Sequence, residues 1–252
     1  MAKESNLQFT NDVILYPLMM VMSLWIIFWA EFRFGWHFKY YGIYPQKIEG
    51  LRGIIFGPFI HADLQHLFNN SIPLLVLGTA LFYFYRNLRW RVLILGTILT
   101  GLLTWIIGRP ALHIGASGVV YLLAAFLFFK GIFSKQYQLT ALAFVVVFLY
   151  GSLLWYIFPM DPKISWEGHL SGFAVGFVFA LLFKSSPLPK PKYAWEEENF
   201  DPENDPFLRH FDEDGNFIEH IPEEEITREE ESKVIIRYTF RNKEKKGGES
   251  SD

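Results

Sequence analysis

The sequence predicts an all-α membrane protein in which a bundle of six transmembrane helices is followed by an acidic tail. Six apolar segments occur before residue 185, each near or somewhat below the roughly 20 residues that a bilayer-spanning helix needs. Charge is divided in the same way: residues 1–184 contain 13 Lys/Arg and 7 Asp/Glu, whereas residues 185–252 contain 10 and 19. We therefore expect a cytoplasmic N-terminus (1–12), a six-helix membrane domain (13–184) and a mostly disordered, acidic cytoplasmic tail (185–252).

The net charge of −3 sums these two unlike parts, so it says nothing about partners. We expect no nucleic-acid partner. Cysteine is absent, which excludes disulfides, thiolate catalysis and Cys-ligated zinc. The first apolar run ends without a small-x-small cleavage site, so we interpret it as a retained span rather than a signal peptide.

The predicted spans can be placed in order, and the charges of the loops between them predict their orientation. The spans are Val13–Ala30, Leu64–Tyr85, Arg91–Ile107, Ser117–Phe129, Leu139–Phe158 and His169–Phe183. The 2–3 turn, the 4–5 turn and the exit from the last span carry most of the cations: Arg86, Arg89, Arg91, Lys130, Lys135, Lys184, Lys190 and Lys192. The positive-inside rule then predicts a multi-pass protein with both termini in the cytoplasm. We expect the membrane to be a bacterial plasma membrane.

The first loop, Glu31–Asp63, departs from this rule because it holds four cations although it lies on the outer side. It is also dense in aromatic residues. We expect this loop to fold and to lie partly in the membrane interface, where aromatic side chains are enriched.

The fourth segment is too short to cross the bilayer. Its roughly 13 residues make a helix of about 20 Å, against a hydrocarbon core of about 30 Å. With Lys130 at the cytoplasmic face, Ser117 would stop about 10 Å below the outer face. Non-helical backbone at that depth requires surrounding protein or a water-filled cavity. The sequence therefore predicts a wet, outward-opening pocket at Ser117, whose neighbours Gly115 and Gly118 leave its hydroxyl uncrowded.

The sixth segment provides a candidate base for this serine. Gly172 and Gly176 form a small-xxx-small pair that lets helices approach backbone to backbone. His169 lies three residues before Gly172, on nearly the same face. With Gly118 beside Ser117, the fourth span is the natural partner for this face. We expect Ser117 and His169 to lie at similar depth.

The second span begins with a polar stretch in which His66 and Asn70 are four residues apart and share a helix face. Such side chains at the mouth of a span are costly unless they serve a cavity. Two donors aimed at a pocket beside a serine are what a developing oxyanion requires.

Each residue also has an ordinary structural interpretation. A Gly-x-Ser-Gly sequence is more often small-residue packing than a nucleophile, and His169 could be a hydrogen-bonded histidine of the bundle. His66 and Asn70 could cap a helix or bridge two spans. Tyr121, one turn after Ser117, is either ordinary core or a ring that stacks under His169.

Metal binding is the rival function for the histidines, namely His61, His66, His113 and His169. No His-Glu-x-x-His motif occurs, and the spacing of His61 and His66 is not one helical turn. We find no acidic residue within the core of a predicted span, which argues against an aspartyl protease or a proton-coupled transporter. We expect no metal and no cofactor.

Three short motifs resemble, in combination, the rhomboid family of intramembrane serine proteases, over roughly Arg52 to Phe183. They are His66-x-x-x-Asn70, Gly115-x-Ser117-Gly118 and Gly168-His169-x-x-Gly172-x-x-x-Gly176. The resemblance implies a six-helix rhomboid-like bundle with a dyad of Ser117 as nucleophile and His169 as general base and acid. This chain has Leu51-Arg52 where the family usually has a Trp-Arg pair in the first loop.

The resemblance also assigns supporting roles. An oxyanion hole would come from the Ser117 backbone N–H with the His66 and Asn70 side chains. Tyr121 would stack on His169, and His61 would support the first loop. We expect a serine endopeptidase that cleaves transmembrane segments of single-span membrane proteins near the outer leaflet of the lipid bilayer. The alternative is a non-catalytic membrane protein that binds unstable transmembrane helices through the same cavity.

Overall fold

The computed structural model describes residues 9–161, 164–184, 193, 195, 198–212 and 214–218. The chain divides into two compact units, Met1–Lys190 and Pro191–Asp252, which we describe separately. Within the described residues the regular structure is entirely helical, apart from two isolated β-bridges.

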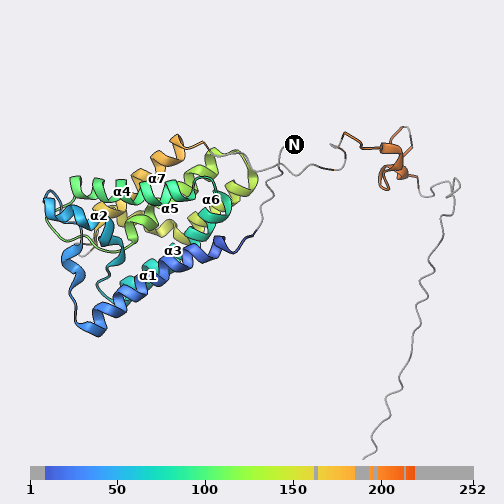
Figure 1. The fold of residues 1–252 in the computed structure, drawn as a ribbon. Helices are drawn as coiled ribbons and strands as arrows, with labels where there is room; N and C mark the ends of the chain where they lie inside the picture. The colour runs from blue at the N-terminus through green and yellow to red at the C-terminus, as the bar shows by residue number, and fades with distance from the viewer. Residues whose placement is uncertain are drawn as a thin grey trace, which may run out of the picture. The chain divides into compact units, whose positions relative to one another are not determined.

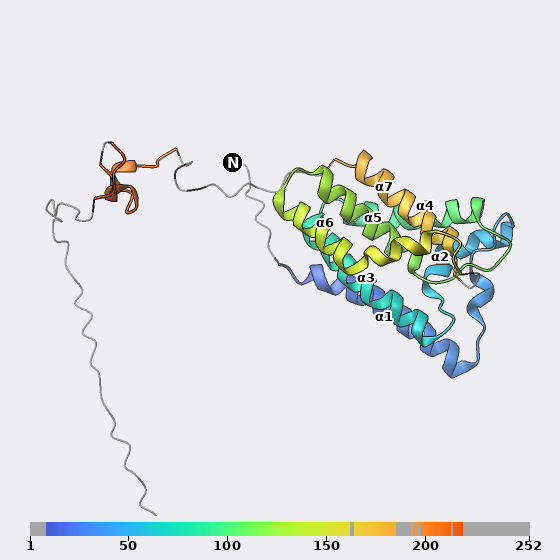
Figure 2. The same ribbon diagram turned by 180° about the vertical axis from the view of Figure 1, so that it is seen from behind.

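The first unit holds seven α-helices among its described residues (Figures 1 and 2). They are α1 (Asp12–Phe34), α2 (Gly53–Phe56), α3 (Leu64–Phe84), α4 (Arg89–Ile107), α5 (Ser117–Phe133), α6 (Tyr137–Tyr150) and α7 (Trp166–Leu182). Three of them, α1, α3 and α4, are long and apolar enough to cross a membrane by length and composition. The helices α5, α6 and α7 are apolar but shorter, at 17, 14 and 17 residues.

Helix α5 forms the centre of the bundle. It packs against α3, α4, α6 and α7, and its side chains Leu122, Leu123, Phe126 and Leu127 are fully buried. Helix α1 lies at the periphery, along α3 (Figures 1 and 2). Large apolar side chains face outward on α1, α4 and α6, as expected for helices whose outer surfaces meet lipid rather than water.

The prediction that the fourth span ends at Phe129 was wrong. Helix α5 continues to Phe133, because Lys130 does not meet water but lies 8% exposed inside the bundle. Its ammonium group donates to the carbonyl oxygens of Ala180 and Phe183 at the end of α7. A cation is favoured there by the negative end of a helix dipole. At 17 residues, α5 is about 25 Å long, still less than the bilayer core.

The last two predicted spans also differ from the structure. The predicted fifth span, Leu139–Phe158, is the α-helix α6 followed at Gly151 by a 3₁₀ helix, η4 (Gly151–Ile157). Helix α7 begins at Trp166, three residues before the predicted start, so Glu167 falls in its first turn with 1% of its side chain exposed. Helix α7 therefore has a buried carboxylate in its first turn, just outside the predicted span.

The first loop is folded, as expected. After α1 it forms the 3₁₀ helices η1 (Phe38–Tyr41), η2 (Ile48–Arg52) and η3 (Gly57–Phe59), with α2 between the last two. The Arg52 side chain donates to the Tyr40 carbonyl and lies 4.6 Å from the centre of the Tyr41 ring. Arg52 therefore ties η2 back onto η1 without the tryptophan that the family resemblance led us to look for.

Helices α5 and α7 touch through their backbones. A Cβ atom on Gly172 would lie 2.1 Å from the Gly118 carbonyl oxygen, and one on Gly176 would lie 2.4 Å from the Leu122 carbonyl oxygen. Any larger residue would force the helices apart, which explains the small-xxx-small pattern physically. The packing face expected from Gly172 and Gly176 is the face that meets α5.

The described residues of the second unit form short turns. They include the 3₁₀ helices η6 (Pro202–Asn204) and η7 (Leu208–His210), and a turn in which the Asp212 carboxylate accepts from the backbone N–H groups of Asp214 and Asn216. The prediction of a mostly disordered tail falls largely on residues 219–252, outside the described residues.

The α5–α7 contact predicts the effect of adding one methyl group. Gly172→Ala should destabilise the protein by about 1–3 kcal/mol, because the new Cβ overlaps the Gly118 carbonyl oxygen. The matched control is Gly151→Ala, whose Cβ would meet only Val147 at 3.4 Å. Thermal unfolding in detergent micelles measures both, and an equal midpoint for the two variants would contradict a backbone contact between α5 and α7.

Candidate active site

Ser117 is the first residue of α5, at the end of a loop that approaches α3 closely. The preceding Gly115 has φ +102°, a left-handed conformation that favours glycine. A Cβ atom there would lie 2.5 Å from Nε2 of His66. The backbone N–H of Gly115 donates to the Gly57 carbonyl at 2.9 Å. Gly115 is thus required both by its conformation and by the ring packed against it.

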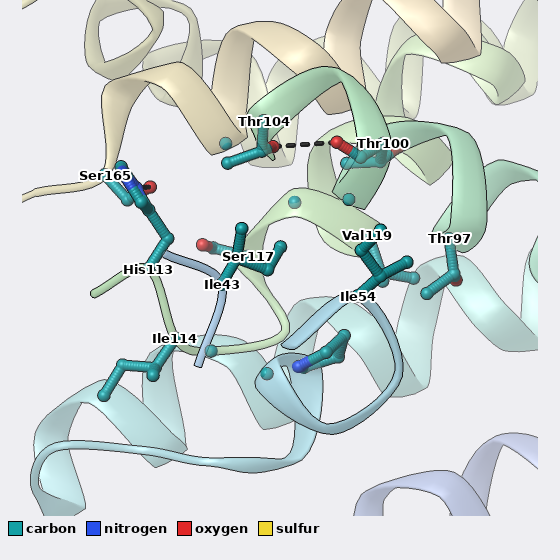
Figure 3. A pocket seen from close by; sticks show the side chains of 16 residues that line it. Ile43, Ile54, Thr97, Thr100, Thr104, His113, Ile114, Ser117, Val119 and Ser165 are labelled. Atoms are coloured by element: carbon teal, nitrogen blue, oxygen red, sulfur yellow. Dashed lines mark hydrogen bonds between the residues drawn. The ribbon is translucent and has the colours of Figure 1, made fainter. Parts of the chain in front are cut away.

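The half-buried Ser117 lines a cavity between α4, α5 and the start of α7 (Figure 3). The space open to the centres of water molecules is about 40 Å³, several times the ~10–15 Å³ that one water needs. Polar side chains in the lining are Thr97, Thr100, Thr104, His113 and Ser165. The buried hydroxyl of Thr100 has no hydrogen-bond partner. The cavity is therefore suited to hold water next to Ser117.

His169 lies in the first turn of α7 and is buried, with 7% of its surface exposed. Its ring stacks on Tyr121 with centroids 4.2 Å apart and an angle of 9° between the planes. Its Nδ1 lies 2.9 Å from the Tyr156 carbonyl oxygen in η4. A carbonyl oxygen only accepts, so Nδ1 carries the proton and Nε2 of the neutral ring has a free lone pair.

The helices that carry Ser117 and His169 are adjacent, but the two side chains are not hydrogen-bonded. Gly118, next to Ser117, packs against Gly168, next to His169. Within the described residues, His169 bonds through Nδ1 to Tyr156, and no hydrogen bond joins its ring to the Ser117 hydroxyl. Catalytic hydrogen bonds are often long without substrate and tighten in the complex.

His66 and Asn70 converge on the loop before Ser117. Asp63 caps α3 by accepting from the His66 backbone N–H at 2.8 Å. A Cβ atom on Gly115 would lie 2.5 Å from Nε2 of His66 and 3.4 Å from Nδ2 of Asn70. Asn70 is 3% exposed, yet its Nδ2 has no hydrogen-bond partner. A buried donor without a partner is costly, which suggests an acceptor that arrives with a ligand.

His61 touches the same loop. Its Nδ1 lies 3.3 Å from the Phe59 carbonyl oxygen, and its Nε2 accepts a long bond of 3.5 Å from the Ala116 backbone N–H. The His61 and His66 rings meet edge to face at 5.0 Å. His61 therefore links the end of the first loop to the residue before Ser117.

Two features of the site were missed by sequence reasoning. The Tyr156 carbonyl is a main-chain acceptor, so no residue type indicates it. Glu167 is a buried carboxylate whose Oε1 accepts from the Arg109 backbone N–H at 3.1 Å and lies 3.6 Å from the Arg109 guanidinium. The only indication of this ion pair in the sequence was the opposite charge of Arg109, in a predicted loop, and Glu167, just before Gly168. In the described part of the chain, no three His, Asp or Glu side chains are grouped to hold a metal ion.

Comparison with known proteins shows which family this part of the chain resembles. Residues 49–186, more than half of the chain, match the Rhomboid domain family. The chain is 40% identical over 154 residues to uncharacterized proteins of Mycobacterium tuberculosis and Mycobacterium bovis, covering 57% of this chain and 64% of each relative. An uncharacterized protein of Mycobacterium leprae is 36% identical over 160 residues, covering 57% and 61%. The chain thus matches less than two thirds of the length of these relatives.

The buried His61 ring, which lies outside the helices, predicts a dependence of stability on pH. Burial lowers the pKa of His61 from 6.5 to about 4, and the neighbouring His66 adds to this effect. The unfolded chain therefore binds more protons between these values, so stability is full above about pH 6.5 and falls toward pH 4. At pH 5 the loss is about 2 kcal/mol. Thermal unfolding in detergent at pH 5 and pH 8 measures it.

The variant His61→Gln tests whether this histidine is the cause, since the amide keeps hydrogen-bonding capacity but does not titrate. It should unfold with a weaker dependence on pH than the wild type. A wild-type midpoint that is the same at pH 5 and pH 8 would refute the prediction.

Proposed function

The chain belongs to the rhomboid family, and on that premise we propose that it is an intramembrane serine endopeptidase with Ser117 as nucleophile and His169 as base. In this proposal six helices, α1 and α3 to α7, cross a bacterial plasma membrane. Residues 1–12 and the acidic tail, 185–252, lie in the cytoplasm. The three span-length helices and three shorter apolar helices support this topology.

The observation that carries the proposal is the environment of the His169 ring. A serine is a poor nucleophile until a base takes its proton. The Tyr156 carbonyl holds the ring in the tautomer whose Nε2 is basic, and Tyr121, one turn after Ser117, fixes its plane. These contacts supply the orientation that a carboxylate supplies in a triad.

The reaction follows from these roles. Nε2 of His169 takes the hydroxyl proton of Ser117 as Oγ attacks the scissile carbonyl carbon. The same proton passes to the leaving amine as the C–N bond breaks, which leaves an acyl-enzyme on Ser117. A water from the cavity then attacks the ester carbonyl and gives its proton to His169, which returns it to Ser117 Oγ.

The negative charge that develops on the carbonyl oxygen needs donors. We propose the Ser117 backbone N–H, the Asn70 amide and Nε2–H of His66 for this role. Nδ1 of His66 accepts from the Ala62 backbone N–H at 3.5 Å, which supports a proton on Nε2. The buried Asn70 Nδ2 without a partner supports a site that is completed only when an oxyanion is present.

Single-span membrane proteins are the proposed substrates, cleaved near the outer leaflet. The short α5 supports this depth, because its first residue would lie below the outer membrane face when its other end is at the cytoplasmic face. A substrate helix must unwind there, since a peptide bond in a regular helix is inaccessible to Ser117.

A second candidate function is recognition of unstable transmembrane helices without cleavage. The lack of a hydrogen bond between Ser117 and His169 within the described residues favours it. In that case the cavity would bind an unwound segment, and the serine would be an ordinary packing residue.

Substitution of the nucleophile and of one oxyanion donor should have different effects on cleavage of a tagged single-span reporter in liposomes. Ser117→Ala should abolish cleavage. Asn70→Ala should lower the rate by about 10²–10³-fold, because one donor is lost and the others remain. The control Ser23→Ala removes a half-buried hydroxyl that only donates to the Met20 carbonyl in α1 and should cleave normally. Undiminished cleavage by Ser117→Ala would end the protease proposal.

Covalent labelling separates the two candidate functions. A fluorophosphonate should form a P–O bond with Ser117 Oγ as fluoride leaves, while His169 takes the hydroxyl proton. Mass spectrometry of the peptide that contains Ser117 reads the adduct. His169→Ala should slow the labelling strongly. A wild-type serine that reacts no faster than the His169 variant would favour the binding function.

A further inference from the structure

A second contact joins the segments that carry Ser117 and His169. His113 is four residues before Ser117, and Ser165 is four residues before His169. Nδ1 of His113 lies 2.5 Å from the Ser165 hydroxyl, and both side chains border the cavity beside Ser117 (Figure 3). This contact therefore links the segment that carries Ser117 (the nucleophile segment) to the segment that carries His169 (the base segment). The link lies four residues before each proposed catalytic residue.

The direction of this hydrogen bond is set by a third group. Nε2 of His113 lies 3.2 Å from the Arg109 carbonyl oxygen, which only accepts, so Nε2 carries the proton. Nδ1 is then an acceptor, and the Ser165 hydroxyl donates to it. Burial lowers the pKa of His113, which lies in the loop before α5, and so favours the neutral ring that this bond requires.

The position of Ser165 makes this bond unusual. Ser165 is the N-cap residue of α7, where a serine normally accepts from a backbone N–H of the first turn. Here it makes no such capping bond. Its hydroxyl is used to hold the neighbouring loop instead of its own helix.

Backbone hydrogen bonds hold both linked segments, so a displacement at His113 or Ser165 would also move Ser117 or His169. Residues 165 and 169 are one helical turn apart. On the other side, the backbone of His113 pairs with Ile43 through bonds of 2.8 and 2.9 Å, and Gly115 is bonded to Gly57. The Arg109 side chain also donates to the Ile164 carbonyl at 2.8 Å. A shift between His113 and Ser165 would thus be passed on to Ser117 and His169.

We propose that His113 and Ser165 are positioning residues that set the register between the nucleophile segment and the base segment. This inference rests on the proposed function, since it concerns the rate of the same reaction. A displacement of about 1 Å between reacting groups can cost about 100-fold in rate. Neither residue needs to touch the substrate for its loss to lower kcat.

The variants separate positioning from stability. Ser165→Ala removes the donor, and His113→Leu removes the acceptor. His113→Asn keeps an amide oxygen near the position of Nδ1 and is the rescue variant. The control Ser134→Ala removes a hydroxyl at the opposite end of α5 that donates to the Gly131 carbonyl. All are measured as full-length protein in liposomes, per folded molecule.

Two rates are measured: cleavage of a single-span reporter, and labelling of Ser117 by a fluorophosphonate, which needs no transmembrane substrate. Ser165→Ala and His113→Leu should lower both kcat and the labelling rate by about 10- to 100-fold. The KM should stay within about twofold, because reporter binding is not altered. The double variant should be no slower than the slower single variant, since both remove one bond. His113→Asn should recover most of the loss.

Each outcome has a distinct meaning. A wild type that neither cleaves nor labels defeats the proposed function, and the positioning role with it. A wild type that is active while Ser165→Ala and His113→Leu keep the wild-type kcat and labelling rate per folded molecule defeats the positioning role alone. A loss of folded protein without a change in these rates also overturns it, because it shows a purely structural bond.

Discussion

The contact between the backbones of α5 and α7 is the constraint on which the rest of the site depends. Gly172 lies against the carbonyl oxygen of Gly118, and Gly176 lies against that of Leu122. Tyr121 and His169 are brought into stacking contact by this approach. Ser117 lies one helical turn before Tyr121 on α5. Larger residues in place of Gly172 and Gly176 would separate α5 from α7 and so move Ser117 away from His169.

Main-chain carbonyls replace carboxylates in orienting the histidines of this site. His169 donates to Tyr156, His61 approaches Phe59 and His113 approaches Arg109. A carbonyl fixes a tautomer as a carboxylate does, but it brings no net charge into an apolar bundle. The one buried carboxylate in the described part of α7, Glu167, is matched by Arg109 instead of by a histidine.

The features that could be predicted from the sequence are those that depend on side-chain spacing and on small residues. The face of Gly172 and Gly176, the pairing of His66 with Asn70 and the short α5 all followed from such patterns. The Tyr156 carbonyl did not, because any residue in η4 could present one. The ends of α5 and α7 were also missed at Lys130 and Glu167, because hydropathy treats a charge as a boundary. In the folded chain each of these charges has a partner that no local window contains.

Lys130 has a consequence for motion in the bilayer. Its ammonium group donates to carbonyl oxygens at the end of α7, while at the opposite end of the helix pair Gly118 packs against Gly168. Because contacts join the two helices at both ends, we expect α5 and α7 to move together as one unit. A rearrangement of the bundle is therefore expected at the neighbours of this pair, such as α6, whose Phe144 and Phe148 side chains face outward.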